Sequence, residues 1–234
     1  MWFFYDYWYI VLVMPAIILS IIANISVQST FNRYSKVRSM RGITGAEAAR
    51  RVLDANGLYS VKIASVRGEL TDHYNPKDNT IYLSESVYNN SSTAAIGVAA
   101  HEAGHAVQHA KEYIPIKIRT AIVPATNFAS KLSIPLILIG LLFSSSSLIL
   151  LAYLGVACFS MSTIFQLVTL PTEFDASRRA INAISSCGIL SRDEIGDAKK
   201  VLTAAAMTYV AALAVSLMQL LRLVLIVSGN SRRR

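Results

Sequence analysis

The sequence is poor in charged residues. Asp, Glu, Lys and Arg make up 15% of the 234 residues, whereas hydrophobic residues make up 53%. Ordinary soluble domains carry about 25% charged residues, so the composition argues against a soluble protein and favours one that lies largely in a lipid bilayer. The net charge of +8 does not indicate nucleic-acid binding, because the basic residues are scattered and form no stripe interleaved with aromatic side chains.

Cysteine is also scarce. The two cysteines, Cys158 and Cys187, lie far apart in the sequence. This excludes a disulfide framework and a zinc site built from CxxC pairs. We interpret both residues as structural.

Lys and Arg are absent before residue 28, and thirteen of them follow between residues 28 and 131. Residues 8–27 are apolar and long enough to span a bilayer. They lack the basic start and the cleavage site of a signal peptide, so residues 1–28 are predicted to form an uncleaved transmembrane anchor. Because basic residues gather on the cytoplasmic side of membranes, the segment after the anchor is predicted to face the cytoplasm.

Residues 29–116 are predicted to form a small α+β domain. A helix is expected after Thr44, which has a capping-box partner in Glu47, and its end is expected at Gly57. Strands are expected at VKIASV and on both sides of the turn in ELTDHYNPKDNTIYLS. A last helix, capped by one of the residues 91–93, is expected to run to about residue 111.

The next two segments differ in polarity. Residues 117–171 are largely apolar and are predicted to form a transmembrane helical hairpin. Its first leg is expected to begin near residue 120, and the SSSS sequence at 144–147 separates its two legs. Residues 172–200 are polar and are predicted to be helical, with Glu173 in the first turn.

Residues 201–234 contain the last apolar stretch and a basic tail. We predict a transmembrane or membrane-embedded helix here, with Arg222 extending to the membrane surface. The predicted fold class is a mainly α membrane protein, in which transmembrane helices are combined with a small α+β domain.

The helix predicted to end near residue 111 carries the sequence AAHEAGHAVQHA. His101 and His105 are four residues apart and so lie on one helix face, which suits two ligands of one ion. Glu102 can accept a proton from a metal-activated water without binding the metal. This is the H-E-x-x-H pattern of zinc peptidases, and it predicts one Zn²⁺ ion. The alternative is a pair of hydrogen-bonded histidines in a helix bundle, but three of the chain's four histidines fall within nine residues.

A catalytic zinc site needs a third protein ligand. His109 is about 12 Å from His101 along a straight helix, and no glycine bend stands before it, so we expect it at most to support a ligand. The best candidate is Glu173 in LPTEFDASRRA, and Asp175 is its rival. Alternatively, Glu173 is a helix-start carboxylate that pairs with the arginines at 178 and 179.

His73 and Tyr74 lie on a predicted edge strand. Zinc peptidases bind extended substrates against such strands by backbone pairing. Either side chain is therefore a candidate for stabilising the oxyanion. The alternative for His73 is a surface or structural role.

Four stretches resemble the bacterial membrane-bound neutral zinc metallopeptidases of the YugP type. They are LTDHYNPKDNTIYLSESVY, STAAIGVAAHEAGHAVQHA, LPTEFDASRRA and VLTAAAMTYVAALA. The resemblance implies peptide hydrolysis, zinc held by His101, His105 and Glu173, and Glu102 as the base.

A looser similarity connects the chain to the membrane metallopeptidases of the heat-shock and CAAX-processing type. Their ligand helix reads E-[FY]-x-A-D, and an Asp in it orients the first histidine. Ser177 stands at that position here, so Ser177 and Asp175 are the candidates for this role.

The sequence therefore predicts a zinc-dependent endopeptidase of the cell membrane. We expect a multi-pass protein whose small α+β domain is zincin-like and catalytic. This domain is expected to face the cytoplasm and to act on peptide or protein substrates. A membrane-protein partner or a homo-oligomer is compatible with this prediction. The alternative functions are a non-catalytic zinc-binding scaffold or chaperone in protein quality control, which has no use for Glu102, and an intramembrane protease, which is disfavoured by polar Gln108, Lys111 and Glu112 beside the motif.

Overall fold

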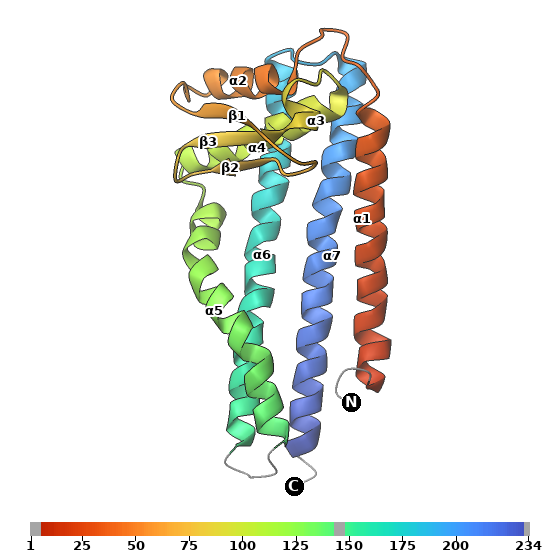
Figure 1. Ribbon diagram of the computed structural model, residues 1–234, viewed down its shortest axis with the longest axis vertical. Helices are drawn as coiled ribbons and strands as arrows, with labels where there is room; N and C mark the ends of the chain where they lie inside the picture. Colours follow the sequence, from red (N-terminus) through yellow and green to blue (C-terminus); the bar gives the residue numbers. More distant parts are fainter. Residues whose placement is uncertain (1–5, 143–147, 232–234) are drawn as a thin grey trace. The chain divides into compact units, whose positions relative to one another are not determined.

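A computed structural model describes residues 6–142 and 148–231, so the predicted SSSS separator at 144–147 lies outside the described residues. The described chain is mainly helical and has one small sheet (Figure 1). Four of its helices are long and apolar enough to cross a membrane. The predicted fold class, a mainly α membrane protein with a small α+β domain, is confirmed.

The chain divides into two compact units. One, which we call the membrane unit, comprises residues 1–22, 118–170 and 209–234. The other, which we call the α+β unit, comprises residues 23–117 and 171–208. The four long helices are α1 (Met14–Tyr34), which follows the π-helix η1 (Tyr9–Val13), α5 (Ile114–Leu142), α6 (Ile149–Ser186) and α7 (Arg192–Ser231).

The α+β unit contains a three-stranded sheet with the order β1 (Lys62–Val66), β3 (Thr80–Ser84) and β2 (His73–Asn75). β2 and β3 are antiparallel around the predicted turn, and β1 pairs with β3 in parallel. All three strands were predicted from the sequence. Because parallel pairing requires a crossover, the local pattern did not indicate that β3 lies at the centre.

Two helices, α2 (Gly45–Ala55) and α4 (Thr93–Ala110), lie beside the sheet (Figure 1). The predicted capping box is present: the Thr44 hydroxyl accepts from the Glu47 amide, and the Glu47 carboxylate accepts from the Thr44 amide. Ser92 caps α4 by accepting from the amide of residue 95. The short helix α3 (Glu85–Tyr88) precedes α4. Fully buried residues of the common core include Leu53, Ile81 and Ile96, and burying each such side chain stabilises the fold by about 1.5–3 kcal/mol.

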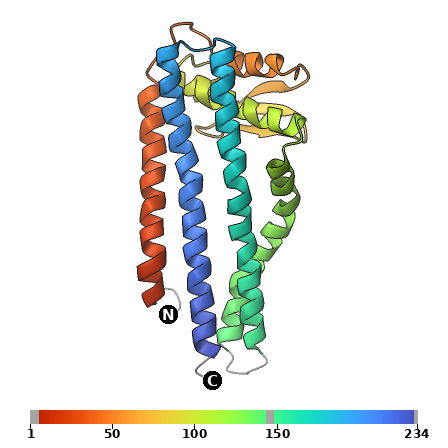
Figure 2. The same cartoon turned by 180° about the vertical axis from the view of Figure 1, so that it is seen from behind.

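The membrane unit has its own apolar cluster. α7 lies beside α5 and α6 (Figure 2), where Ile137, Ala152, Leu223 and Val227 are buried together. Two expectations for this region were wrong. α5 begins at Ile114 instead of near residue 120, and α6 continues through Pro171 to Ser186.

Glu173 consequently lies within a long helix and not in the first turn of a new one. Proline lacks a backbone N–H and usually ends or kinks a helix, but in long membrane helices the freed backbone groups find other partners. Pro171 lies inside α6, and the helix continues past it. A helix dipole therefore does not explain the position of the Glu173 carboxylate.

Arg222, which was predicted to extend to the membrane surface, is paired within the membrane unit. Its side chain is buried, and its guanidinium donates from Nη2 to Asp6 Oδ2 at 2.7 Å and from Nε to the same oxygen at 3.0 Å. The guanidinium also lies 5.2 Å from the centroid of the Tyr9 ring. A buried charge is tolerated when it is paired, and here the pair joins the two ends of the chain within the membrane unit.

Candidate metal centre

Three potential ligands converge in the α+β unit. His101 Nε2 and His105 Nε2, both on α4, lie 3.3 Å and 3.5 Å from Glu173 Oε2 on α6. The ligand atoms of the three residues all lie within 4.8 Å of one another. In a tetrahedral zinc site with Zn–N distances of about 2.0 Å, neighbouring ligand atoms are ~3.3 Å apart. The two distances to Glu173 are therefore close to the spacing that one tetrahedral ion would require, so these three residues could hold such an ion.

The electrostatics of this cluster also favour a cation. Glu173 is only 2% exposed, and an isolated buried carboxylate is strongly disfavoured. Burial alone would lower the pKa of the His105 imidazole, but the hydrogen bond to Glu173 and the negative charge of Glu102 raise it above its usual range. The two carboxylates thus favour a positive charge beside His105.

α4 and α6 approach each other closely at Gly104. A Cβ atom built at this position would lie 2.8 Å from the carbonyl oxygen of Ala176. A backbone oxygen cannot move away as a flexible side chain would. Gly104 therefore sets the distance between the helix that carries the two histidines and the helix that carries Glu173.

We expect Gly104→Ala to lower both thermal stability and zinc affinity, because the added methyl group forces α4 away from α6. Overpacking of this kind typically costs about 1–3 kcal/mol. The matched control is Gly97→Ala on the same helix, where the new Cβ would meet the Ala198 side chain at 3.4 Å. The control is expected to be neutral or stabilising by up to ~1 kcal/mol through helix propensity. Thermal melts with and without zinc measure both effects, and equal behaviour of the two variants would contradict the packing argument.

The second nitrogen of each histidine also has a partner. Ser177 Oγ lies 3.2 Å from His101 Nδ1, and Gln108 Oε1 lies 3.0 Å from His105 Nδ1. These contacts leave both Nε2 atoms directed at Glu173. The sequence indicated Gln108 only as a polar residue beside the motif. Its position three residues after His105, on the same helix face, was the signal that could have indicated its contact with the His105 ring.

Asp175 does not contact the cluster directly. It is 4% exposed and accepts hydrogen bonds from Gln108, Arg178 and Arg179. The two arginines thus pair with Asp175 and not with Glu173, contrary to the alternative weighed for Glu173. The Arg179 guanidinium also lies over the ring of Tyr113.

Glu102 is buried on α4, with 8% of its surface exposed. Within residues 6–142 and 148–231, its carboxylate makes no hydrogen bond or ion pair, although its charge acts on His105. It is thus a carboxylate with access to a little solvent and with no protein group bound to it. Such a group can accept a proton from a water molecule beside the cluster.

The structure directs the polar atoms of His73 and Tyr74 elsewhere. His73 Nδ1 lies 2.8 Å from the carbonyl oxygen of Thr71, and its ring stacks on Tyr82. The Tyr74 hydroxyl donates to Asn79, and the Tyr74 ring packs against that of His109. His109 is therefore held at the end of α4 beside β2.

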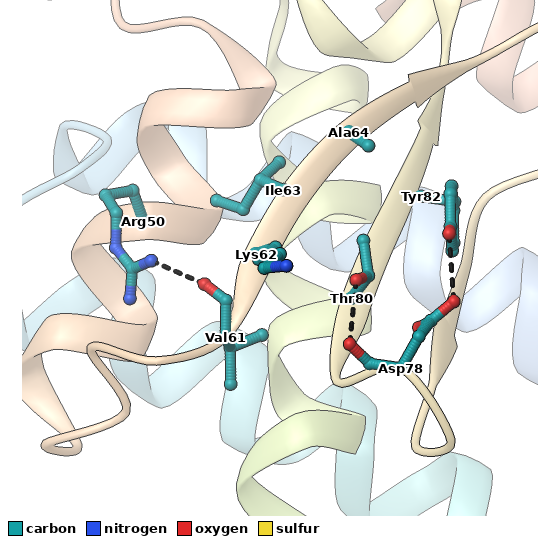
Figure 3. A pocket seen from close by; sticks show the side chains of 8 residues that line it. All are labelled: Arg50, Val61, Lys62, Ile63, Ala64, Asp78, Thr80 and Tyr82. Carbon is teal, nitrogen blue, oxygen red and sulfur yellow. Dashed lines mark hydrogen bonds between the residues drawn. The ribbon is translucent and has the colours of Figure 1, made fainter.

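A separate hollow of about 700 Å³ lies over β1 and β3 (Figure 3). Arg50 donates to the carbonyl oxygen of Val61 at its edge, and the Tyr82 hydroxyl donates to Asp78. His101, His105 and Glu173 are not among its lining residues. The hollow is thus distinct from the candidate metal centre.

Comparisons with known proteins agree with this geometry. A family model described as "Putative neutral zinc metallopeptidase" matches residues 9–228. The chain is 50% identical over 218 residues to a Bacillus subtilis (strain 168) protein named "Putative membrane protease YugP", and the alignment covers 93% of this chain and 96% of that relative. No solved structure matches the chain.

Proposed function

Because the chain belongs to the neutral zinc metallopeptidase family, we propose that it is a membrane-embedded endopeptidase that uses one zinc ion. The observation that carries this proposal is the convergence of His101, His105 and Glu173 beside Glu102, whose carboxylate makes no hydrogen bond or ion pair within the described residues. A site for binding alone has no need of such a carboxylate.

His101, His105 and Glu173 would hold the ion. When bound, zinc supplies a Lewis acid that polarises the peptide carbonyl and acidifies water. Glu102 accepts the proton of the attacking water and then delivers it to the leaving amine. The low exposure of these residues keeps bulk water away and strengthens their electrostatic interactions.

We assign substrate binding to β2. In the described part of the sheet it is an edge strand that pairs only with β3, and it contacts α4. An extended peptide can add to such an edge by backbone hydrogen bonding. His73 and Tyr74 on this strand are then more suited to contacting the substrate than to stabilising the oxyanion, because His73 Nδ1 and the Tyr74 hydroxyl already have partners.

Metal removal tests this function. The detergent-purified protein is expected to contain one zinc per chain and to cleave an unfolded protein such as casein. Incubation with a zinc chelator should abolish cleavage, and added zinc should restore it. Zinc content by mass spectrometry and fluorescent peptide release provide the measurements. Cleavage that survives complete zinc removal would refute the mechanism.

We propose that the α+β unit faces the cytoplasm and that α7 crosses the membrane. The basic residues after the anchor support this orientation, and the Asp6–Arg222 pair brings the end of α7 to the beginning of α1. In a Cys158→Ala/Cys187→Ala background, an impermeant maleimide added to intact cells should label Asn230→Cys and not Ser60→Cys. Permeabilised cells, in which Ser60→Cys becomes labelled, are the control. Labelling of Ser60→Cys in intact cells would show that the α+β unit faces outward and would contradict the proposed orientation.

A further inference from the structure

Gln108 is a fully buried polar residue on α4, about one turn after His105. A buried amide needs partners for both its NH₂ group and its oxygen. Its Nε2 donates to the carbonyl oxygen of Thr172 at 2.8 Å and to Asp175 Oδ2 at 2.9 Å. A carbonyl oxygen and a carboxylate only accept. These two contacts therefore fix the direction of the amide, with its NH₂ group toward α6.

The fixed amide determines the state of His105. Gln108 Oε1 faces His105 Nδ1 at 3.0 Å, and an amide oxygen can only accept. The other acceptor at this ring, Glu173 Oε2, lies farther away, 3.5 Å from Nε2. The shorter contact with Gln108 therefore favours the neutral tautomer that carries its proton on Nδ1 and leaves the lone pair on Nε2. Gln108 thus selects the tautomer that binds a metal.

Asp175 completes this arrangement from α6. Arg178 and Arg179 hold its carboxylate, so it is a fixed, ionised acceptor for the Gln108 amide. The His101 ring lacks this kind of control, because the Ser177 hydroxyl at its Nδ1 can either donate or accept. The two histidines of the motif are therefore oriented by different chemistry.

We infer that Gln108 is a positioning residue of the metal centre, which fixes the tautomer of His105, and that Asp175 acts on His105 through Gln108. This inference rests on the proposed zinc site. It differs from the family pattern considered for the sequence, in which an acidic residue acts directly on the first histidine. Here the acidic residue acts through an amide on the second.

If Gln108 had only a structural role, it would hold α4 and α6 together, which we call a tie between the two helices. Two variants distinguish this role from the inferred one. Gln108→Met removes every polar contact at similar volume. Gln108→Glu loses the amide donor to both Thr172 and Asp175, but it keeps an oxygen that accepts from His105 Nδ1. A tie predicts similar losses in both variants, whereas the inference predicts that Gln108→Glu retains the tautomer.

The first measurement is the tautomer itself, in protein without metal. With only four histidines in the chain, ¹⁵N ring labelling resolves each imidazole at a pH where the rings are neutral. We expect His105 to be protonated at Nδ1 in the wild type and in Gln108→Glu, and to shift toward Nε2 protonation in Gln108→Met. Protonation of His105 at Nε2 in the wild type, or its loss from Nδ1 in Gln108→Glu, would overturn the inference even if Gln108→Met does not fold.

The second measurement is zinc affinity by competition with a chromogenic chelator. Removing a hydrogen-bond partner of a metal-binding histidine typically costs 10- to 100-fold in affinity, and we expect this loss for Gln108→Met. Gln28→Met makes the same chemical change at an exposed position on α1 and should bind zinc as the wild type does. Asp175→Asn should weaken binding alone but cause no further loss in the Gln108→Met background, because the effect passes through Gln108.

Additive losses for Asp175→Asn and Gln108→Met would show that Asp175 acts by another route. Wild-type affinity in Gln108→Met would overturn the inference while leaving the proposed function intact. A wild-type protein that binds no zinc would instead refute the proposed function, and with it the metal-positioning role. Zinc binding by the wild type thus distinguishes a failure of the inference from a failure of the proposed function.

Discussion

Replacing Glu102 by glutamine is expected to lower peptide hydrolysis by about 10²- to 10⁴-fold, the usual contribution of a general base. Glutamine has nearly the same volume as glutamate but cannot accept the proton of the attacking water. Because Glu102 is not one of the three converging ligands, zinc content should remain at one ion per chain. Single-turnover cleavage and zinc analysis on the same sample measure both quantities.

The control for this variant is Glu85→Gln on α3, which makes the same change in the α+β unit. It should leave cleavage unchanged. Full activity of Glu102→Gln with one zinc bound would contradict the assigned mechanism. A wild-type protein that binds zinc tightly but cleaves nothing would favour the non-catalytic scaffold that the sequence left as an alternative.

Replacing Glu173 by alanine is expected to reduce zinc affinity by more than the ~10²-fold that is typical for residues that only support a ligand. The change removes the one carboxylate that both Nε2 atoms approach. Activity should fall together with zinc content, unlike the outcome for Glu102→Gln. Metal titration followed by chelator competition measures the loss.

Asp175→Ala is the informative comparison for Glu173→Ala. Asp175 is similarly buried but contacts Gln108 and two arginines. Its replacement should weaken zinc binding less, and saturating zinc should restore the occupied site. If Glu173→Ala bound zinc as tightly as the wild type and Asp175→Ala did not, the third ligand would be Asp175.

The features predicted correctly are those encoded by local spacing. Thr44 and Glu47 form a capping box because residues three apart meet at a helix start. The four-residue spacing of His101 and His105 likewise places both rings on one face of any helix that forms there. Each arrangement depends on only a few neighbouring residues.

The features missed depend on contacts between distant segments. Pro171 and Glu173 resemble a helix start, yet packing and length carry α6 past them. The contacts of Gln108 with Thr172 and Asp175 depend on the close approach of α4 and α6 at Gly104. No local pattern predicts which carboxylate will contact a given residue in the folded chain. Arg222, for example, pairs with Asp6, which is 216 positions away in the sequence.

That separation has a consequence for biosynthesis. Translation proceeds at roughly 5–20 residues per second, so Asp6 is synthesised about ten to forty seconds before Arg222. Asp6 must therefore enter the membrane before its partner exists. His101 and Glu173 are 72 positions apart, which corresponds to about four to fourteen seconds at the same rate. On the proposed assignment, the nascent chain carries its histidines with no third ligand. On the same assignment, proteolytic activity would be withheld until Glu173 is synthesised, so the insertion machinery and the nascent chain would not be exposed to it.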